Sequence, residues 1–221
     1  MAESIAFKRG DGEDCKGYYV APRAGESASG VVVLQEWWGL NDQIKGVANR
    51  LAQAGYRALV PDLYKGKVAL DALEAEHLMS NLDFGDAATQ DIRGAIQYLK
   101  QSSPKVAALG FCMGGVLAIL AAMFVTEIDA AVPWYGIPPE EAGDPKIIKI
   151  PLQGHFALED AHFPPSQVDV LESKLKEGNL THEIYRYQAN HGFGNETGEN
   201  YDPEAKDLAW KRTLEFLGKY L

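Results

Sequence analysis

The sequence predicts an α/β fold with a mostly parallel central sheet and helices on both faces. Short runs of apolar, β-branched residues alternate with longer segments of helical periodicity, which is the pattern of parallel strands joined through helices. A chain of 221 residues suits one domain of ordinary size. Neither an internal repeat nor a linker-like segment divides it, so we expect residues 1–221 to form a single domain.

The first elements are expected to be an antiparallel hairpin and a buried strand. Residues 5–9 and 15–21 are strand-like and flank the turn sequence Gly-Asp-Gly at residues 10–12. Residues 31–34 are consecutive Val and Leu residues, which is typical of a strand buried on both faces.

A helix and a short strand come next. Asn41 is a suitable N-cap and Gly55 a suitable C-terminal residue for a helix over residues 41–55. Residues 56–60 then predict a short strand that Pro61 stops, because proline lacks the N–H that a sheet requires.

The middle of the chain predicts two helical segments around a buried strand. Residues 70–100 have helical character, interrupted near residues 81–85, and their second part carries an apolar stripe that we expect to face the core. Residues 106–109 read as a buried strand and residues 114–124 as a strongly apolar helix.

The last part of the chain completes the sheet. Three further strands are expected over residues 130–135, 150–154 and 182–187, with a helix near residues 166–177 between the last two. Residues 203–221 predict an amphipathic helix with proline in its first turn. The residues of this helix expected to face the core are Leu208, Leu214 and Leu217.

Composition and charge exclude several classes of function. The formal net charge of −10 disfavours nucleic acids and anionic membrane surfaces, both of which attract basic proteins. No apolar stretch approaches the roughly 20 residues of a membrane span, and the charged N-terminus lacks a signal-peptide core. Cys15 and Cys112 are too few for a disulfide framework, although one bridge between them is conceivable. We expect a cytoplasmic monomer or homodimer.

The clearest chemical motif is Gly110-Phe-Cys112-Met-Gly114, between the strand at residues 106–109 and the apolar helix. It is the thiol form of the nucleophile elbow, in which a sharp turn from strand to helix raises the central side chain above the sheet. The glycines lack the β-carbons that would collide in so tight a turn. The N-terminus of the helix favours a thiolate. The alternative is a small buried cysteine in a packing site that the glycines make room for.

A thiol nucleophile needs a histidine base. In enzymes built on such an elbow, the nucleophile, an acid and a histidine follow in that order along the chain. His191 lies after the last strand and before the C-terminal helix, which is the position this order demands. The remaining histidines lie earlier, at positions 77, 155, 162 and 182. The alternative for His191 is a solvated loop residue.

The acid is expected after the second strand beyond the nucleophile. Asp160 lies there, Glu159 is its nearest rival, and Asp169 belongs to the following helix. The alternative for Asp160 is a solvated loop carboxylate. A metal site formed with His155 and His162 is not expected, because the spacing matches no recognised set of ligands.

Glu36 is a charged residue between a buried strand and two tryptophans, in the segment Gln-Glu-Trp-Trp-Gly. Desolvating a carboxylate there is costly, so we expect Glu36 to have a functional or structural role. Beside the nucleophile it would raise the pKa of the thiol. It could also form an ion pair with a nearby arginine, and the two interpretations are compatible.

Together these motifs resemble the dienelactone hydrolase (carboxymethylenebutenolidase) family of the α/β-hydrolase superfamily, over nearly the whole chain. The matching segments are residues 35–39, 110–115, 155–164 and 191–193, with Tyr201 and Trp210 downstream. The cysteine elbow combined with the Glu36 segment is quite specific, because most α/β hydrolases use serine. The resemblance implies an α/β-hydrolase fold and no metal or organic cofactor.

The resemblance also implies roles for individual residues. Cys112, His191 and Asp160 form a triad, and Glu36 helps to deprotonate Cys112 when substrate arrives. The backbone N–H groups of Trp37 and Met113 form an oxyanion hole. Family members open an enol-lactone by acyl transfer to the cysteine and then hydrolyse the thioester.

One departure concerns the substrate. Asn195 stands where founding members of the family have an arginine that binds the substrate carboxylate, and Arg93 is a weak candidate for their second arginine. A neutral lactone or ester is therefore as acceptable as an anionic one. The residues expected to contact the substrate are Trp38, Tyr135, Phe193 and Asn195, although aromatic residues at strand ends are often simply core.

Three functions remain open. The first is a hydrolase that opens a dienelactone-like lactone or cleaves a small ester through a cysteine acyl-enzyme. The second is a broad carboxylesterase or thioesterase with the same triad. The third is a non-catalytic binding protein in which Cys112 is a redox-responsive thiol.

Overall fold

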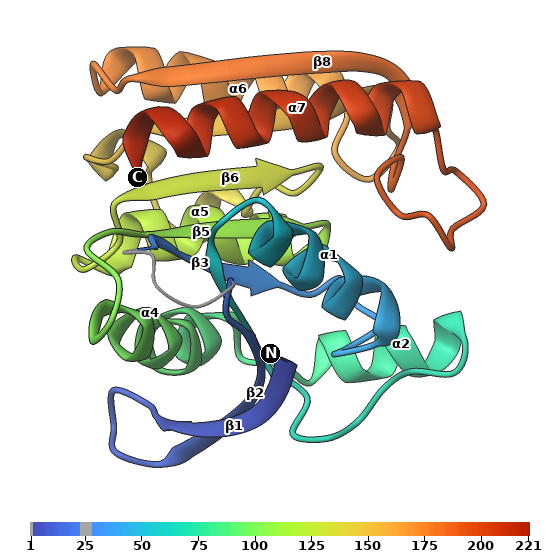
Figure 1. The fold of residues 1–221 in the computed structure, drawn as a ribbon. Coiled ribbons are helices and arrows are strands. Elements are labelled where there is room, and N and C mark those ends of the chain that lie inside the picture. Colours follow the sequence, from blue (N-terminus) through green and yellow to red (C-terminus); the bar gives the residue numbers. More distant parts are fainter. Residues whose placement is uncertain (1, 23–27) are drawn as a thin grey trace.

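A single eight-stranded sheet forms the centre of the computed structural model, which describes residues 2–22 and 28–221. The strands lie in the order β1-β2-β4-β3-β5-β6-β7-β8, from the N-terminal hairpin at one edge to β8 at the other (Figure 1). They are β1 (Ala2–Lys8), β2 (Asp14–Val20), β3 (Gly30–Leu34), β4 (Arg57–Pro61), β5 (Val106–Phe111), β6 (Ala130–Trp134), β7 (Leu152–Glu159) and β8 (His182–Asn190). β1 and β2, and β2 and β4, pair antiparallel, and all other pairs are parallel. The mostly parallel sheet is confirmed.

Helices cover both faces of this sheet, as predicted. They are α1 (Asp42–Gln53), α2 (Ala72–Ser80), α3 (Phe84–Asp86), α4 (Arg93–Lys100), α5 (Met113–Phe124), α6 (Pro165–Glu177) and α7 (Pro203–Tyr220), with a π-helical stretch Ala87–Ile92 before α4. Alternate side chains of β3 point to opposite faces. Val31 and Val33 pack in the core under α1 and α7, and Val32 and Leu34 in the core under α4 and α5.

Most elements lie where the sequence predicts them, but several bounds differ. β7 and β8 extend beyond residues 154 and 187, because the hydrogen-bonding groups of polar residues in them find partners inside the sheet. His155 in β7 bonds to the Tyr187 hydroxyl (2.7 Å) and to Gln153 (2.9 Å). β6 ends one residue earlier than predicted, since Tyr135 has a φ of 36°, outside the extended region.

The expected inward face of α7 is partly wrong. Leu217 is fully buried, but Leu208 is 44% exposed. Nine residues separate the two, and at 3.6 residues per turn they lie on opposite sides of the helix. The face that packs on the sheet instead carries Ala209, Thr213 and Phe216 along with Leu217.

Two further features bear on function. Cys15 and Cys112 are both free thiols, so the conceivable bridge between them is absent. Within residues 2–22 and 28–221, no helix combines the length and the apolar character that crossing a bilayer demands.

Candidate active site

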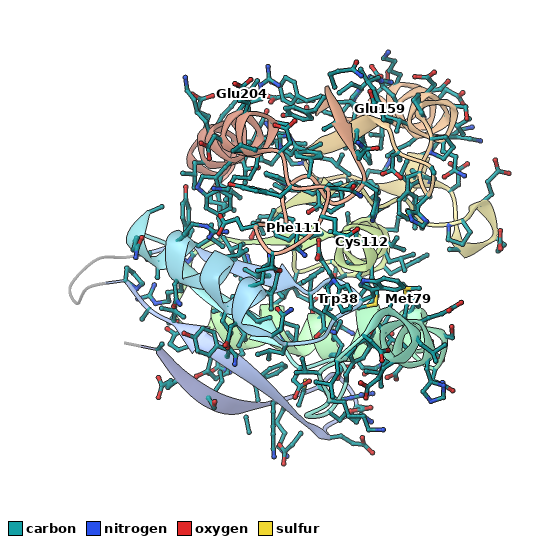
Figure 2. The ribbon with its side chains drawn as sticks, turned by 90° about the vertical axis from the view of Figure 1, so that its right-hand side faces the viewer. Trp38, Met79, Phe111, Cys112, Glu159 and Glu204 are labelled. Atoms are coloured by element: carbon teal, nitrogen blue, oxygen red, sulfur yellow. The ribbon has the colours of Figure 1, made fainter. Side chains whose placement is uncertain are left out.

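The turn between β5 and α5 places Cys112 at the carboxyl edge of the sheet. Its backbone has φ 54° and ψ −116°, a strained conformation for a residue with a side chain. A Cβ on Gly110 would collide with the carbonyl oxygen of Gly114, and a Cβ on Gly114 with that of Leu34. The two glycines thus permit the elbow that the motif predicts. Figure 2 looks onto this edge, where Cys112, Trp38 and Met79 lie near the middle.

Cys112, His191 and Asp160 form a continuous hydrogen-bonded chain. Nε2 of His191 lies 3.1 Å from Sγ of Cys112, and Nδ1 lies 2.8 Å from Oδ2 of Asp160. The other oxygen of Asp160 accepts backbone N–H bonds from His162 (2.8 Å) and Phe163 (2.9 Å). Burial opposes ionisation of Asp160, but these hydrogen bonds outweigh it and lower its pKa. The ionised carboxylate therefore fixes the tautomer of His191 that presents Nε2 to the sulfur.

The thiol of Cys112 is neutral at rest. Burial and the negative charge of Glu36 raise the pKa of Cys112 well above its usual range, and the backbone N–H of Met113 opposes this only in part. The side chain is partly buried and unpaired with Cys15. A reaction at this sulfur therefore requires a group that takes its proton, and His191 is in place to do so.

Glu36 lies buried directly after β3, only 6% exposed. Its oxygens accept hydrogen bonds from the Tyr135 hydroxyl (3.2 Å) and from Nδ2 of Asn195 (2.5 Å). Burial raises the pKa of Glu36, against the effect of both donors. The interpretation of Glu36 as the partner of an arginine is wrong, because its hydrogen-bond partners are neutral. Arg93, the candidate for a second substrate-binding arginine, pairs with Glu127, 2.8 Å away, and lines neither cavity described below.

The two residues assigned to an oxyanion hole lie beyond the carboxyl ends of two neighbouring strands. Trp37 follows Glu36 beyond the end of β3, and Met113 begins α5; β3 and β5 are neighbouring parallel strands. Both residues line the same cavity as Cys112. The role of their N–H groups remains a prediction.

Two cavities meet at Cys112 and share Trp37, Cys112 and His191. The larger has a volume of about 1060 Å³ and runs between α5 and α6; we call it the apolar groove. The smaller, about 120 Å³, is the polar cavity. Its further lining residues include Glu36, Trp38, Asn195, Glu199 and Asn200.

The four residues expected to contact substrate divide into two pairs. Trp38 and Asn195 line the polar cavity. Tyr135 and Phe193 are fully buried and lie on the wall of neither cavity, so the expectation that they touch substrate is wrong. They form an aromatic support instead: the ring of Tyr135 meets those of His191 (5.3 Å between centroids) and Phe193 (5.2 Å) edge to face.

Other polar residues considered from sequence have different surroundings. His155 is fully buried in the core, where burial lowers its pKa well below the usual range. His162 packs its ring edge to face on His191, 4.9 Å between centroids, and lines the apolar groove. Across the described part of the chain, no group of three or more His, Cys, Asp or Glu residues is arranged to hold a metal ion.

Sequence reasoning missed most of the apolar groove. Its walls come from four separate segments, and residues such as Val116 and Leu120 read simply as core. The partly exposed apolar residues Met79, Phe84 and Val170 were the one signal that could have indicated it, because they lie on otherwise polar surfaces.

Comparisons with known proteins concern the family and the fold of the chain. Residues 15–221 match the model of the dienelactone hydrolase family. The protein usf of Aquifex pyrophilus is 33% identical over 233 residues, covering 100% of both chains. A carboxymethylenebutenolidase of Pseudomonas putida is 30% identical over 98% of this chain and 96% of its own. A solved structure from Klebsiella pneumoniae, assigned as a dienelactone hydrolase, has a TM-score of 0.87 at 24% identity and covers 100% of both chains. The predicted α/β-hydrolase fold is thereby confirmed.

Proposed function

Because the chain belongs to the dienelactone hydrolase family, we propose that it hydrolyses a carboxylic ester or lactone through an acyl-enzyme on Cys112. The observation that carries the proposal is the 3.1 Å contact between Nε2 of His191 and Sγ of Cys112, with Asp160 bonded to the opposite ring nitrogen. The base is thus within hydrogen-bonding distance of both the nucleophile and the orienting acid.

Acylation begins when Sγ of Cys112 attacks the carbonyl carbon and its proton passes to His191. The carbonyl oxygen becomes an oxyanion between the N–H groups of Trp37 and Met113, where one such donor is worth about 3–4 kcal/mol of barrier. Collapse of this intermediate breaks the carbon–oxygen bond, and His191 donates the proton to the departing alkoxide. With a lactone, the alcohol stays attached to the acyl group.

Deacylation repeats these steps with water. His191 takes a proton from the water as its oxygen attacks the thioester, and returns the proton to the sulfur as the acid leaves. The resting thiol is regenerated, and the net reaction adds one water to one ester.

Glu36 is proposed to promote the first proton transfer. Burial raises the pKa of Glu36 and so makes its carboxylate a better proton acceptor, and its charge holds the idle thiol protonated. A substrate that disturbs the bonds from Tyr135 and Asn195 would free Glu36 to take the proton from Cys112 and pass it on to His191.

The substrate is proposed to be uncharged at the reacting end. Asn195 donates its amide N–H to Glu36, and among the described residues the lining of the polar cavity includes the carboxylates of Glu36 and Glu199 but neither lysine nor arginine. A carboxylate placed there would be repelled rather than bound.

The nucleophile is tested by Cys112→Ala, which we expect to abolish hydrolysis of p-nitrophenyl acetate while the far-UV circular dichroism stays unchanged. Cys15→Ala is the matched control, because the second cysteine lies in the core and outside both cavities. Acid quenching during turnover should trap an acetyl group on Cys112, visible by mass spectrometry. Full activity of Cys112→Ala would remove the assignment.

Two alternatives are separated by further measurements. Comparing turnover of lactones with that of acyclic esters and thioesters distinguishes a lactone hydrolase from a broad carboxylesterase or thioesterase. Stoichiometric labelling of Cys112 by iodoacetamide without any ester turnover would instead indicate a thiol-bearing binding protein.

A further inference from the structure

The apolar groove is a channel that starts at the nucleophile. On α5 its lining residues Met113, Val116 and Leu120 follow one another at spacings of three and four, so they share one helical face. Three of the residues on α6 that line the opposite wall, Gln167, Val170 and Lys174, repeat the same spacing. Each of the two helices therefore presents one face to the groove.

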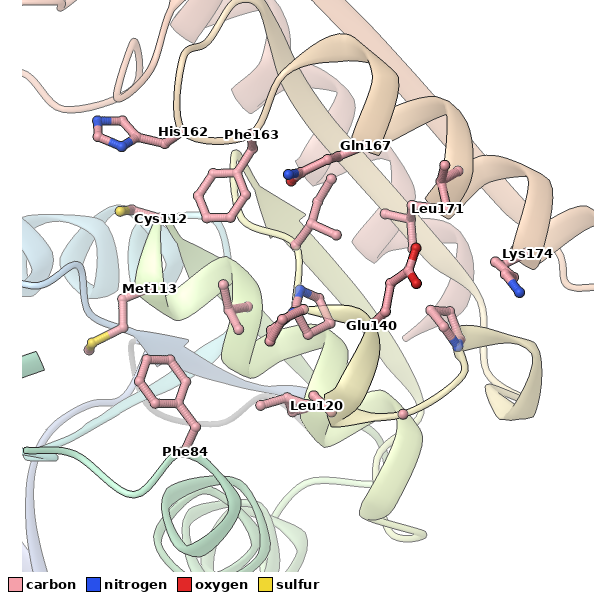
Figure 3. Close-up of a pocket in the computed structure, with 18 of the residues that line it drawn as sticks. Phe84, Cys112, Met113, Leu120, Glu140, His162, Phe163, Gln167, Leu171 and Lys174 are labelled. Atoms are coloured by element: carbon pink, nitrogen blue, oxygen red, sulfur yellow. The ribbon is translucent and has the colours of Figure 1, made fainter. Parts of the chain in front are cut away.

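The length of the groove follows from these walls. At a rise of 1.5 Å per residue, the wall from Met113 to Leu120 spans about 10 Å and that from Gln167 to Lys174 about the same. Figure 3 shows Cys112 at one end of the view and Lys174 at the other. A medium-chain acyl group in extended form has this length.

Chemistry changes along the groove. Near the sulfur and in its middle the lining is mostly apolar, with Phe84, Phe163 and the prolines at positions 138 and 139 in the loop after β6, although His162 and Gln167 also line it. The charged lining residues are Glu140, Asp144 and Lys174, and Figure 3 shows Glu140 and Lys174 away from the sulfur. An apolar chain therefore gains from burial along the groove only until it reaches these charged groups.

The two cavities place the two halves of an ester differently. The polar cavity, with Glu36, Asn195 and His191 in its walls, is suited to the departing alcohol and to the water that replaces it, since both exchange a proton with His191. The acyl group remains on the sulfur during both steps. The acyl group is therefore expected to lie in the apolar groove. The volume of this groove, about 1060 Å³, is at the upper end of the volumes of small-molecule binding sites.

We infer that the preferred substrates carry a hydrophobic, medium-length acyl chain, which the apolar groove binds between α5 and α6. This inference rests on the proposed function and names its substrate class. It distinguishes this chain from an enzyme built for a compact lactone, because a small ring would leave most of the groove empty.

The test measures kcat/KM for p-nitrophenyl acetate, butanoate, octanoate and dodecanoate, corrected for spontaneous hydrolysis and kept below the concentrations at which the esters form micelles. Full burial gains about fourfold per methylene. Because the α6 wall is partly exposed, we expect a smaller total gain of at least about tenfold from acetate to octanoate, with no further gain for dodecanoate.

A variant of the groove links this preference to the structure. Val170→Asp places a charge on an exposed wall residue and should lower the octanoate-to-acetate ratio by at least threefold. Leu208→Asp is the matched control: it is an equally exposed helical residue outside both cavities, and the ratio should not change.

The possible outcomes distinguish a failure of the acyl-chain inference from a failure of the proposed function. If acetate is cleaved through Cys112 but octanoate is no better, or if Val170→Asp leaves the ratio unchanged, the inference about the acyl chain is wrong and the proposed function survives. If no ester is cleaved in a manner that depends on Cys112, the proposed function fails and this inference fails with it.

Discussion

Replacing Gly110 by alanine adds a single methyl group where β5 passes the first turn of α5. The new Cβ would collide with the carbonyl oxygen of Gly114 and would lie 2.9 Å from the backbone nitrogen of Gly115. Both neighbours are main-chain atoms, so no side-chain rotation can relieve the contact. The strand and the helix must separate, and Cys112 must move with them.

The size of the effect follows from this geometry. Overpacking of a closely packed site costs about 1–3 kcal/mol. For a chain of this length, each kcal/mol lowers Tm by roughly 2–4 °C, so we expect a decrease of about 2–12 °C. Activity should fall further, by about 100-fold, because a displacement near 1 Å breaks the 3.1 Å contact between Cys112 and His191.

Calorimetry and p-nitrophenyl acetate hydrolysis measure the two effects. Gly46→Ala is the matched control: this glycine lies inside α1, and the nearest atom to its added Cβ is Nη1 of Arg50 at 3.8 Å. Its Tm should stay equal or rise, since alanine favours a helix by about 1 kcal/mol over glycine. If Gly110→Ala kept both the Tm and the activity of the natural protein, the steric account of the elbow would be refuted.

Two further predictions concern buried titratable groups. Glu36→Gln should lower the rate of p-nitrophenyl acetate hydrolysis at least tenfold with unchanged circular dichroism, because it removes the carboxylate beside the thiol. Glu159→Gln is the control and should leave the rate unchanged. If Glu36→Gln also left the rate unchanged, the role of Glu36 would be structural only. Burial and the charge of Arg212 hold the pKa of His155 well below its usual range, whereas in the unfolded chain it is near 6.5. Below pH 6.5 the unfolded state binds a proton that the folded state does not. The free energy of unfolding should therefore fall by about 1.4 kcal/mol for each unit by which the pH is lowered. Denaturant titrations between pH 7 and 5 should show this slope, and His155→Gln should reduce it; an equal slope in both proteins would contradict the assignment.

The parts of the site that the sequence could predict are those carried by local pattern or by chain order. Gly110, Cys112 and Gly114 are close in sequence, and the steric demand of the turn is visible in their identity. His191 and Asp160 could be identified because the order of elements along the chain limits where a base and an acid can stand.

The parts that could not be predicted depend on tertiary contacts. The bond from Asn195 to Glu36 joins residues 159 positions apart, and no local pattern specifies it. The full burial of Tyr135 and Phe193 follows from packing among several aromatic rings, whereas their sequence position suggested exposure to substrate. The apolar groove likewise exists only because four separate segments converge around one face of α5.

The neutral state of the Cys112 thiol has a consequence for how the protein meets electrophiles and oxidants. Peroxides and simple alkylating reagents react with the thiolate, which is scarce in the resting protein. Reagents that merely collide with the sulfur should therefore modify it slowly. An effective covalent inhibitor must first bind in the neighbouring cavities and promote removal of the thiol proton. Its selectivity would therefore come from its fit to the cavities rather than from its intrinsic reactivity.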